Sequence, residues 1–176
     1  MARVFIGVGS NIDPQANVRE AVKLLARDVH VVAISTVYLT DAEGASEQSA
    51  FYNGVIEAET ELPAAQLKHS LLRRIEATLG RRRTADKYAA RTVDLDLLLY
   101  DDLLTDTGDL VLPDPDIARR PFLAIPLFEL APELALPGTG ERIAEIAARF
   151  SDHPMTPLPE FTQQLRKEIA HGHHHS

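Results

Sequence analysis

Two aspartates, Asp94 and Asp96, interrupt a run that is otherwise apolar between residues 93 and 99. In a β-strand alternate side chains share a face, so both carboxylates point the same way, roughly 6 to 7 Å apart along the strand. Carboxylates this close repel each other unless a positive group neutralises them, and hard cations such as Mg²⁺ bind ligands of this type. The pair is therefore a candidate metal site. The alternative is a half-exposed strand whose solvent face happens to carry two acids.

A cationic segment precedes this strand. Residues 81–91 hold five positive side chains and one negative, a net charge of +4 in eleven residues: Arg81, Arg82, Arg83, Lys87 and Arg91 against Asp86. Carboxylates that hold metal ions and arginines that hold phosphate together form a nucleotide-phosphate site. Phosphoryl transfer needs such positive charge around the transferring group. Taken alone, the segment is also compatible with a solvated charged turn.

The composition favours a globular protein that binds a small polyanion. The chain of 176 residues is long enough for one domain with a real core, and its net charge of −8 disfavours general nucleic-acid binding. It has no cysteine, which suits a reducing compartment. Its apolar runs are far shorter than the ~20 residues of a membrane span, and the first residues lack a signal-peptide pattern. We therefore expect a cytoplasmic protein without nucleic-acid or membrane partners.

The elements that must position these residues alternate along the first hundred positions. β-branched and apolar runs predict strands, apolar residues at helical spacing predict helices, and Gly, Pro and Asp mark their ends. The predicted strands cover residues 3–8, 29–39, 51–61 and 93–100, and the predicted helices cover 14–27 and 63–79. Residues 40–50 have loop composition. The resulting order, βαββαβ, is that of a ferredoxin-like α/β sandwich.

Further elements are expected after residue 100. The sequence predicts a short edge strand over residues 110–113, and helices over 122–130, 141–149 and 160–170. We expect one domain over residues 1–150 and a C-terminal extension over 151–176, separated by a proline-containing linker. Its last residues, HGHHHS, predict a disordered tail or tag remnant whose histidines bind nickel only incidentally.

The chain resembles the 6-hydroxymethyl-7,8-dihydropterin pyrophosphokinases. The resemblance covers about residues 3 to 137 and rests on several blocks that occur in the same order as in that family. They are FIGVGSN (5–11), S-x-x-Y-x-T (35–40), Q-x-x-F-Y-N-G-V (48–55), LGRRR (79–83), ARTVDLDLLLY (90–100), LPDPD (112–116) and RPFLAIPLFELAPEL (120–134). A chance match of so many blocks is improbable, although G-x-G-S-N or D-x-D alone would be a weak signal.

This resemblance implies a three-layer ferredoxin-like fold and a reaction of folate biosynthesis. Asp94 and Asp96 would bind two Mg²⁺ ions that bridge the phosphates of ATP. The pterin hydroxymethyl oxygen would then attack the β-phosphorus, and AMP would leave. Asp96 is also a candidate base, although a metal-bound carboxylate is a poor proton acceptor and a water could serve instead.

The resemblance also implies two groups of binding residues. The catalytic and ATP-binding residues would be Arg81 and Arg91, assisted by Arg83, Lys87, Arg120 and Glu76. The pterin would lie between aromatic rings and against an amide, at Thr40, Gly44, Phe51, Asn53 and Phe122. Core packing remains an alternative for Phe51 and Phe122, and a solvated helix face for Glu76.

Four positions depart from the family pattern. Ala89-Ala90 replaces a Gly-Pro pair, which alters a moving loop, and Tyr88 replaces a common tryptophan. Asp41-Ala42-Glu43 adds two acids to the pterin loop. Asp114 stands where the family has a histidine that contacts ATP phosphates, and a carboxylate there would repel the nucleotide unless a cation or proton intervened.

Three functions therefore stay open at this point. The first is a monomeric, ATP- and Mg²⁺-dependent pterin diphosphokinase. The second is a diverged paralogue that acts on a related pterin alcohol or has lost activity. The third is a non-catalytic ligand-binding module, since ferredoxin-like folds host such modules as readily as enzymes.

Overall fold

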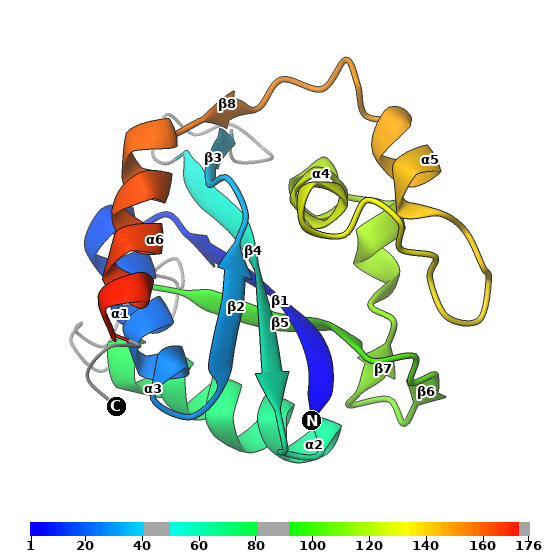
Figure 1. The fold of residues 1–176 in the computed structure, drawn as a ribbon, viewed down its shortest axis with the longest axis horizontal. Coiled ribbons are helices and arrows are strands. Elements are labelled where there is room, and N and C mark those ends of the chain that lie inside the picture. Colours follow the sequence, from blue (N-terminus) through cyan, green and yellow to red (C-terminus); the bar gives the residue numbers. More distant parts are fainter. Residues whose placement is uncertain (41–49, 81–91, 173–176) are drawn as a thin grey trace.

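The computed structural model describes residues 1–40, 50–80 and 92–172 (Figure 1). A six-stranded antiparallel sheet has the order β5–β1–β4–β3–β8, and β2 also pairs with β4. The strands are β1 (Ala2–Ser10), β2 (His30–Ile34), β3 (Tyr38–Thr40), β4 (Phe51–Thr60), β5 (Asp94–Tyr100) and β8 (Thr156–Pro157). The predicted βαββαβ order and the ferredoxin-like fold class are confirmed.

Helices cover both faces of this sheet (Figure 1). One layer holds α1 (Pro14–Ala26), the continuous α2–η1–α3 helix (Ala64–Gln66, Leu67–Leu72, Arg73–Gly80) and α6 (Pro159–Gly172). Their buried residues join those of the sheet in one hydrophobic core. The other layer holds α4 (Pro121–Leu130) and α5 (Ile143–Ala148), with a second core of its own. The sheet thus contributes to two cores, one on each face.

The predicted strand over residues 29–39 is wrong in one respect, because the structure divides it into β2 and β3. Ser35 lies between them, fully buried, and its hydroxyl accepts a hydrogen bond from the Val55 amide (2.9 Å) while donating one to the Thr36 carbonyl (2.9 Å). A side chain thus takes a place that a backbone group would fill in a regular ladder, and the strand breaks there.

Other boundaries also differ from the sequence-based expectation. The first strand continues through Gly9 and Ser10, two residues beyond its predicted end at residue 8. The predicted edge strand over 110–113 becomes β7 (Val111–Leu112), which pairs with β6 (Thr105–Asp106) in a separate two-stranded sheet. A 3₁₀ turn, η2 (Pro115–Ala118), then leads into α4. The helix over 64–80 has a π-helical middle at Leu67–Leu72.

The C-terminal segment packs against the domain. β8 pairs with the outer edge of β3, and α6 contributes Phe161 and Leu165 to the core that α1 and the sheet share. Residues 173–176 lie outside the described part of the chain, so the disordered His-rich tail and the division at residue 150 stay predictions.

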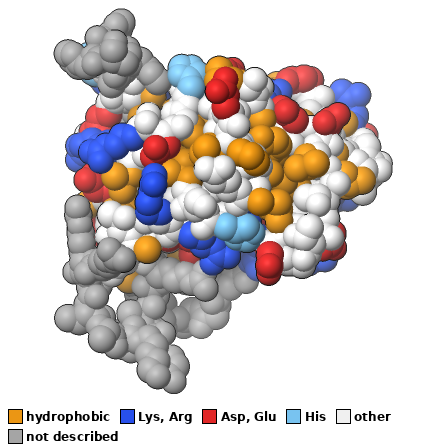
Figure 2. Space-filling view, turned by 90° about the horizontal axis from the view of Figure 1, so that it is seen from below, with side chains coloured by type: hydrophobic (Ala, Val, Ile, Leu, Met, Phe, Trp, Pro, Cys, Tyr) orange, Lys and Arg blue, Asp and Glu red, His pale blue; other side chains and the backbone are white. Residues whose placement is uncertain are grey.

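Figure 2 shows hydrophobic side chains gathered on the face that carries the N-terminus and the β6–β7 sheet. The exposed large hydrophobic residues of the protein include Met1, Leu103 and Leu104.

In residues 1–40, 50–80 and 92–172, no helix is long and apolar enough to cross a membrane.

We predict that Ser35→Ala lowers the free energy of unfolding by about 1 to 3 kcal/mol, because the buried Val55 amide then loses its acceptor. Urea denaturation followed by circular dichroism measures the change. Ser70→Ala, on the exposed side of η1, is the matched control and should change it by less than about 0.5 kcal/mol. Equal midpoints for the two variants would contradict the role given to Ser35.

Candidate active site

A row of paired residues crosses three strands and brings the predicted metal and pterin residues onto one sheet face. Gly9 of β1 pairs with Asp94 of β5 on one side and with Asn53 of β4 on the other. Residues directly opposite each other in a sheet share a face. Two strand spacings, about 10 Å, therefore separate the Asn53 and Asp94 backbones. In the next row Gly7 pairs with Asp96.

The glycines of these rows allow side chains of neighbouring elements to approach the β1 backbone closely. A β-carbon on Gly9 would come within 2.7 Å of Asn53 Oδ1, closer than real contacts allow. One on Gly7 would lie 3.2 Å from Leu123 Cδ2 of α4, which closes this end of the face. The missing side chain at Gly9 thus leaves room for the Asn53 amide, and α4 bounds the face at Gly7.

Three candidate pterin-binding residues lie on β3 and β4, whereas the aspartates lie on β5. Asn53 is buried, and its amide nitrogen donates to Thr40 Oγ1 at 2.7 Å. Thr40 pairs with Phe51, which is half-buried two residues before Asn53 on the same face of β4. The amide of Asn53 is therefore held in a fixed orientation beside Gly9.

The start of α4 brings a cation and an aromatic ring to the same layer. The Arg120 guanidinium lies 5.6 Å from the centre of the Phe122 ring, and Arg120 Nε is 3.7 Å from Asp116 Oδ2. Phe122 packs partly against the core beneath α4. This contact supports core packing as a role for Phe122. The predicted contact between its ring and the pterin stays a prediction.

Four carboxylates surround Asp96. Partial burial and then the negative charges of Asp114, Asp94, Glu76 and Asp116, in that order, together raise the pKa of Asp96 to about 6. Asp96 nevertheless remains accessible to solvent, so a cation can reach it. A cluster of this kind favours either a proton or a bound cation at neutral pH.

Asp114 has a local structural role at the position where a histidine was expected. Its Oδ1 accepts a hydrogen bond from the Asp116 amide at 2.9 Å, which caps the η2 turn. Burial raises the pKa of Asp114, and Asp116 adds to the effect, whereas the hydrogen bond from the Asp116 amide and the charges of Lys68 and Arg120 lower it. The carboxylate thus stabilises the turn that borders Asp96.

Glu76 holds the strand that carries the aspartates. β5 lies at the edge of the sheet, and Glu76 Oε2 of α3 accepts a hydrogen bond from the Leu95 amide at 2.9 Å. This contact gives Glu76 a position next to Asp96, so the alternative of a wholly solvated helix residue is wrong. Its predicted contact with ATP stays a prediction.

A small cavity of about 230 Å³ opens beside Asp96. Its lining residues are Lys68, Asp96, Leu97, Val111, Asp114 and Pro115. Lys68 of η1 was not predicted, because a single lysine on a helix carries no distinctive signal in the sequence. Its Nζ donates to the Asp109 carbonyl, and its charge lowers the pKa of Asp114. A larger cavity of about 550 Å³ lies next to it, between the β6–β7 sheet and residues 136–141.

Some predicted residues lie outside the described part of the chain. These are Arg81, Arg83, Lys87 and Arg91 of the cationic segment and Gly44 of the pterin loop, together with the departures at 41–43 and 88–90.

Among the described residues, no three His, Cys, Asp or Glu side chains are grouped so as to hold a metal ion. Asp94 and Asp96 alone are enough for Mg²⁺, which usually takes one or two carboxylates and completes its shell with water and phosphate oxygens.

Comparison with known proteins agrees with the resemblance drawn from the motifs. Residues 5–132 match the sequence model of the family described as 7,8-dihydro-6-hydroxymethylpterin-pyrophosphokinase (HPPK). The 2-amino-4-hydroxy-6-hydroxymethyldihydropteridine pyrophosphokinase of Haemophilus influenzae is 35% identical over 161 residues, which cover 90% of this chain and 99% of that protein. The protein of the same name from Pseudomonas aeruginosa is 35% identical over 160 residues, or 89% and 97%.

A solved structure also has this fold. A Plasmodium falciparum HPPK-DHPS triple mutant matches with a TM-score of 0.68 and 11% sequence identity, over 86% of this chain and 43% of that chain. At this identity the match indicates the fold alone. The chain spans less than half the length of that protein and nearly the whole length of the two bacterial relatives.

We predict that Asp96→Asn stabilises the metal-free protein at pH 8 by about 1 kcal/mol and has little effect near pH 4. The folded protein binds this proton more tightly than the unfolded chain, so stability falls as the pH rises from about 4 to about 6. Urea midpoints in EDTA measure the effect, with exposed Asp102→Asn as the control. Destabilisation at pH 8 would contradict the charge repulsion.

Proposed function

We propose that this chain, which belongs to the 7,8-dihydro-6-hydroxymethylpterin-pyrophosphokinase family, transfers the diphosphate of ATP to the hydroxymethyl group of 6-hydroxymethyl-7,8-dihydropterin. AMP is the second product. The observation that carries this proposal is the row Asn53–Gly9–Asp94, which sets a buried amide and a carboxylate pair on one face of the sheet. A pterin on the amide and a triphosphate on the carboxylates would meet over Gly9.

Asp94 and Asp96 fit two magnesium ions. They are hard oxygen ligands on one face. Burial and then the neighbouring negative charges raise the pKa of Asp96, and a bound cation would relieve the repulsion among those charges. When bound, the ions would supply the positive charge that orients the phosphate chain and stabilises its transferring group. The protein's own task is to hold the two carboxylates at the edge of the sheet, which the bond from Leu95 to Glu76 supports.

The pterin end of the site needs a flat pocket with a directional polar group. Asn53 offers an amide whose orientation is fixed by Thr40, and an amide can donate to and accept from one edge of a heterocycle. Phe51 and Phe122, from β4 and α4, supply aromatic surface for stacking. We assign these four residues and Gly44 to pterin recognition.

The cationic residues are assigned to the phosphate chain. Arg120 lies at the start of α4, and Arg81, Arg83, Lys87 and Arg91 precede β5 in the sequence. Guanidinium groups bind phosphate oxygens in a bidentate manner and offset the charge that develops in the transition state. Arg81 and Arg91 are the ones we assign to catalysis, and Glu76 lines the ATP side. A water, or Asp96, accepts the hydroxyl proton.

The two bacterial relatives carry the name of this activity and have nearly the same length. We propose a monomer as the active unit. The cysteine-free sequence and the use of ATP favour the cytoplasm.

We predict pterin-dependent release of AMP from ATP and Mg²⁺. Asp94→Asn and Asp96→Asn should each lower turnover by at least about a thousandfold, because each removes a metal ligand, whereas Asp102→Asn keeps wild-type activity. Thermal melting confirms that the variants fold. ATP binding without AMP release would favour a diverged paralogue, with Asp114→His as the first variant to assay. Binding of pterin that needs neither metal nor the aspartates would favour a non-catalytic module.

We also predict that Asn53→Leu lowers kcat/KM for the pterin by about a hundredfold or more, because buried hydrogen-bonding groups of the substrate are left unpaired. ATP affinity should change by less than threefold. Tyr52→Phe, at the adjacent β4 position on the opposite face, is the control. A similar loss for ATP and pterin would contradict the assignment of Asn53 to the pterin.

A further inference from the structure

At the break between β2 and β3, backbone groups form hydrogen bonds to α4, to α6 and to the residue before α6. The Val37 amide donates to Thr162 Oγ1 (2.9 Å), and the Val37 carbonyl accepts from the Leu158 amide (2.8 Å). The Thr36 amide donates to both carboxylate oxygens of Glu129 (3.0 and 3.1 Å). Buried backbone groups without partners are costly, so this break is stable only while these contacts hold.

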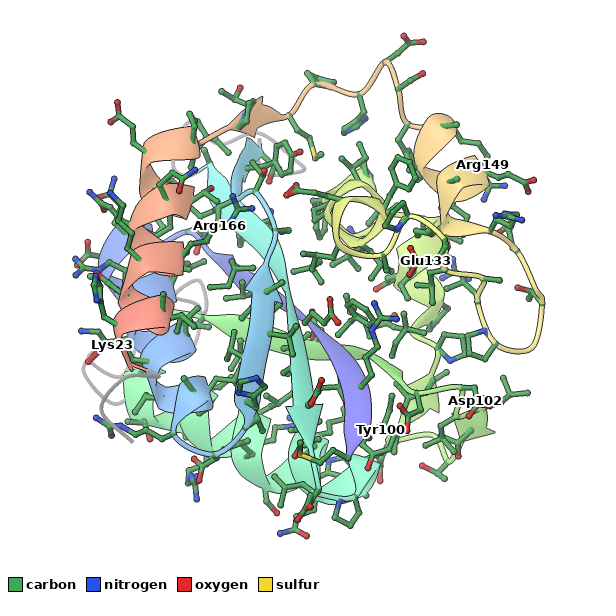
Figure 3. All side chains as sticks on the ribbon, in the orientation of Figure 1. Lys23, Tyr100, Asp102, Glu133, Arg149 and Arg166 are labelled. Atoms are coloured by element: carbon green, nitrogen blue, oxygen red, sulfur yellow. The ribbon has the colours of Figure 1, made fainter. Side chains whose placement is uncertain are left out.

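Arg166 completes the arrangement from the middle of α6. Its Nε and Nη2 both donate to the Ile34 carbonyl (3.0 and 2.9 Å), and Nη2 also lies 3.3 Å from Glu129 Oε2. Figure 3 shows the Arg166 side chain reaching from α6 toward the strands. One guanidinium therefore joins α6, the end of β2 and α4.

These contacts lead directly to the pterin side of the candidate site. β8 pairs with β3 at Tyr38–Pro157 and Leu39–Thr156, so the C-terminal segment flanks β3 on its outer edge. β3 ends at Thr40, whose hydroxyl orients the Asn53 amide. The ring of Phe161 packs edge-on against Tyr52 of β4 at 5.4 Å, next to Asn53. A shift of β3 would therefore change the orientation of Asn53.

The metal side of the site is supported separately. β5 lies at the other edge of the sheet, with β1 and β4 between it and β3. Pairing of β5 with β1 and the Glu76 contact to Leu95 hold its aspartates in place. None of the α6 contacts described above involves β5 or Glu76. Loss of an α6 contact should thus affect the two ends of the site unequally.

We infer that the segment 156–172, beyond the residues 5–132 that match the family, is a positioning element for the pterin, with Arg166 and Thr162 as its positioning residues. They act through β3 and Thr40 on the Asn53 amide, and they set pterin affinity while leaving ATP affinity unchanged. The inference rests on the proposed function.

The test compares Arg166→Met with Lys167→Met, which alters an exposed neighbour on the same helix, and Thr162→Val with Thr162→Ser, which keeps the hydroxyl. Steady-state AMP release is measured with pterin and ATP varied in turn. For Arg166→Met and Thr162→Val the KM for pterin should rise about five- to tenfold, with kcat and the KM for ATP within twofold of wild type. Lys167→Met and Thr162→Ser should resemble wild type.

Melting temperatures separate positioning from folding. A lower melting temperature with an unchanged KM for pterin, or equal rises in the KM for both substrates, would overturn the inference and leave the proposed function intact. If wild-type protein releases no AMP, the same variants are compared by pterin fluorescence titration, where the dissociation constant should rise by the same factor. Wild-type protein that neither reacts with nor binds the pterin would refute both.

Discussion

Repulsion among the carboxylates around Asp96 is the constraint on which the site depends. Asp96 lies among Asp94, Glu76, Asp114 and Asp116, and partial burial together with these charges raises its pKa to about 6. Such a cluster weakens the folded state at neutral pH unless a cation binds. Two of these carboxylates, Asp94 and Asp96, lie in the otherwise apolar β5, and they are the ones that we propose as metal ligands, with the cationic residues as the complementary charge for phosphate.

Two glycines of β1 leave the sheet face that carries Asp94 and Asp96 without side chains of its own at their positions. Gly9 lies between Asn53 and Asp94 in one row of the sheet and leaves room for the Asn53 amide, and Gly7 lies under Leu123 of α4. Support comes from the periphery: Glu76 holds the β5 edge, and α6 holds the β3 edge. Phe122 packs against the second core beneath α4 and α5, and Arg120 directly precedes α4.

Much of this arrangement could be predicted from local sequence. The alternation in residues 93–99 placed both aspartates on one face, and helical spacing located the main helices. The split at Ser35 was missed, because a serine in a β-branched run gives no sign that its hydroxyl will replace a backbone partner. Lys68 and the Glu76–Leu95 contact depend on packing between distant elements, as does the docking of α6. The register that sets Asn53 beside Gly9 is likewise non-local.

The most direct test of the central claim is to locate metal ions in a complex with ATP's α,β-methylene analogue and Mn²⁺ by anomalous X-ray scattering. The account predicts two Mn²⁺ ions within coordinating distance of the Asp94 and Asp96 carboxylates, both bridged by the triphosphate, and their loss in Asp94→Asn. Nucleotide bound at full occupancy with no metal on either aspartate would contradict it.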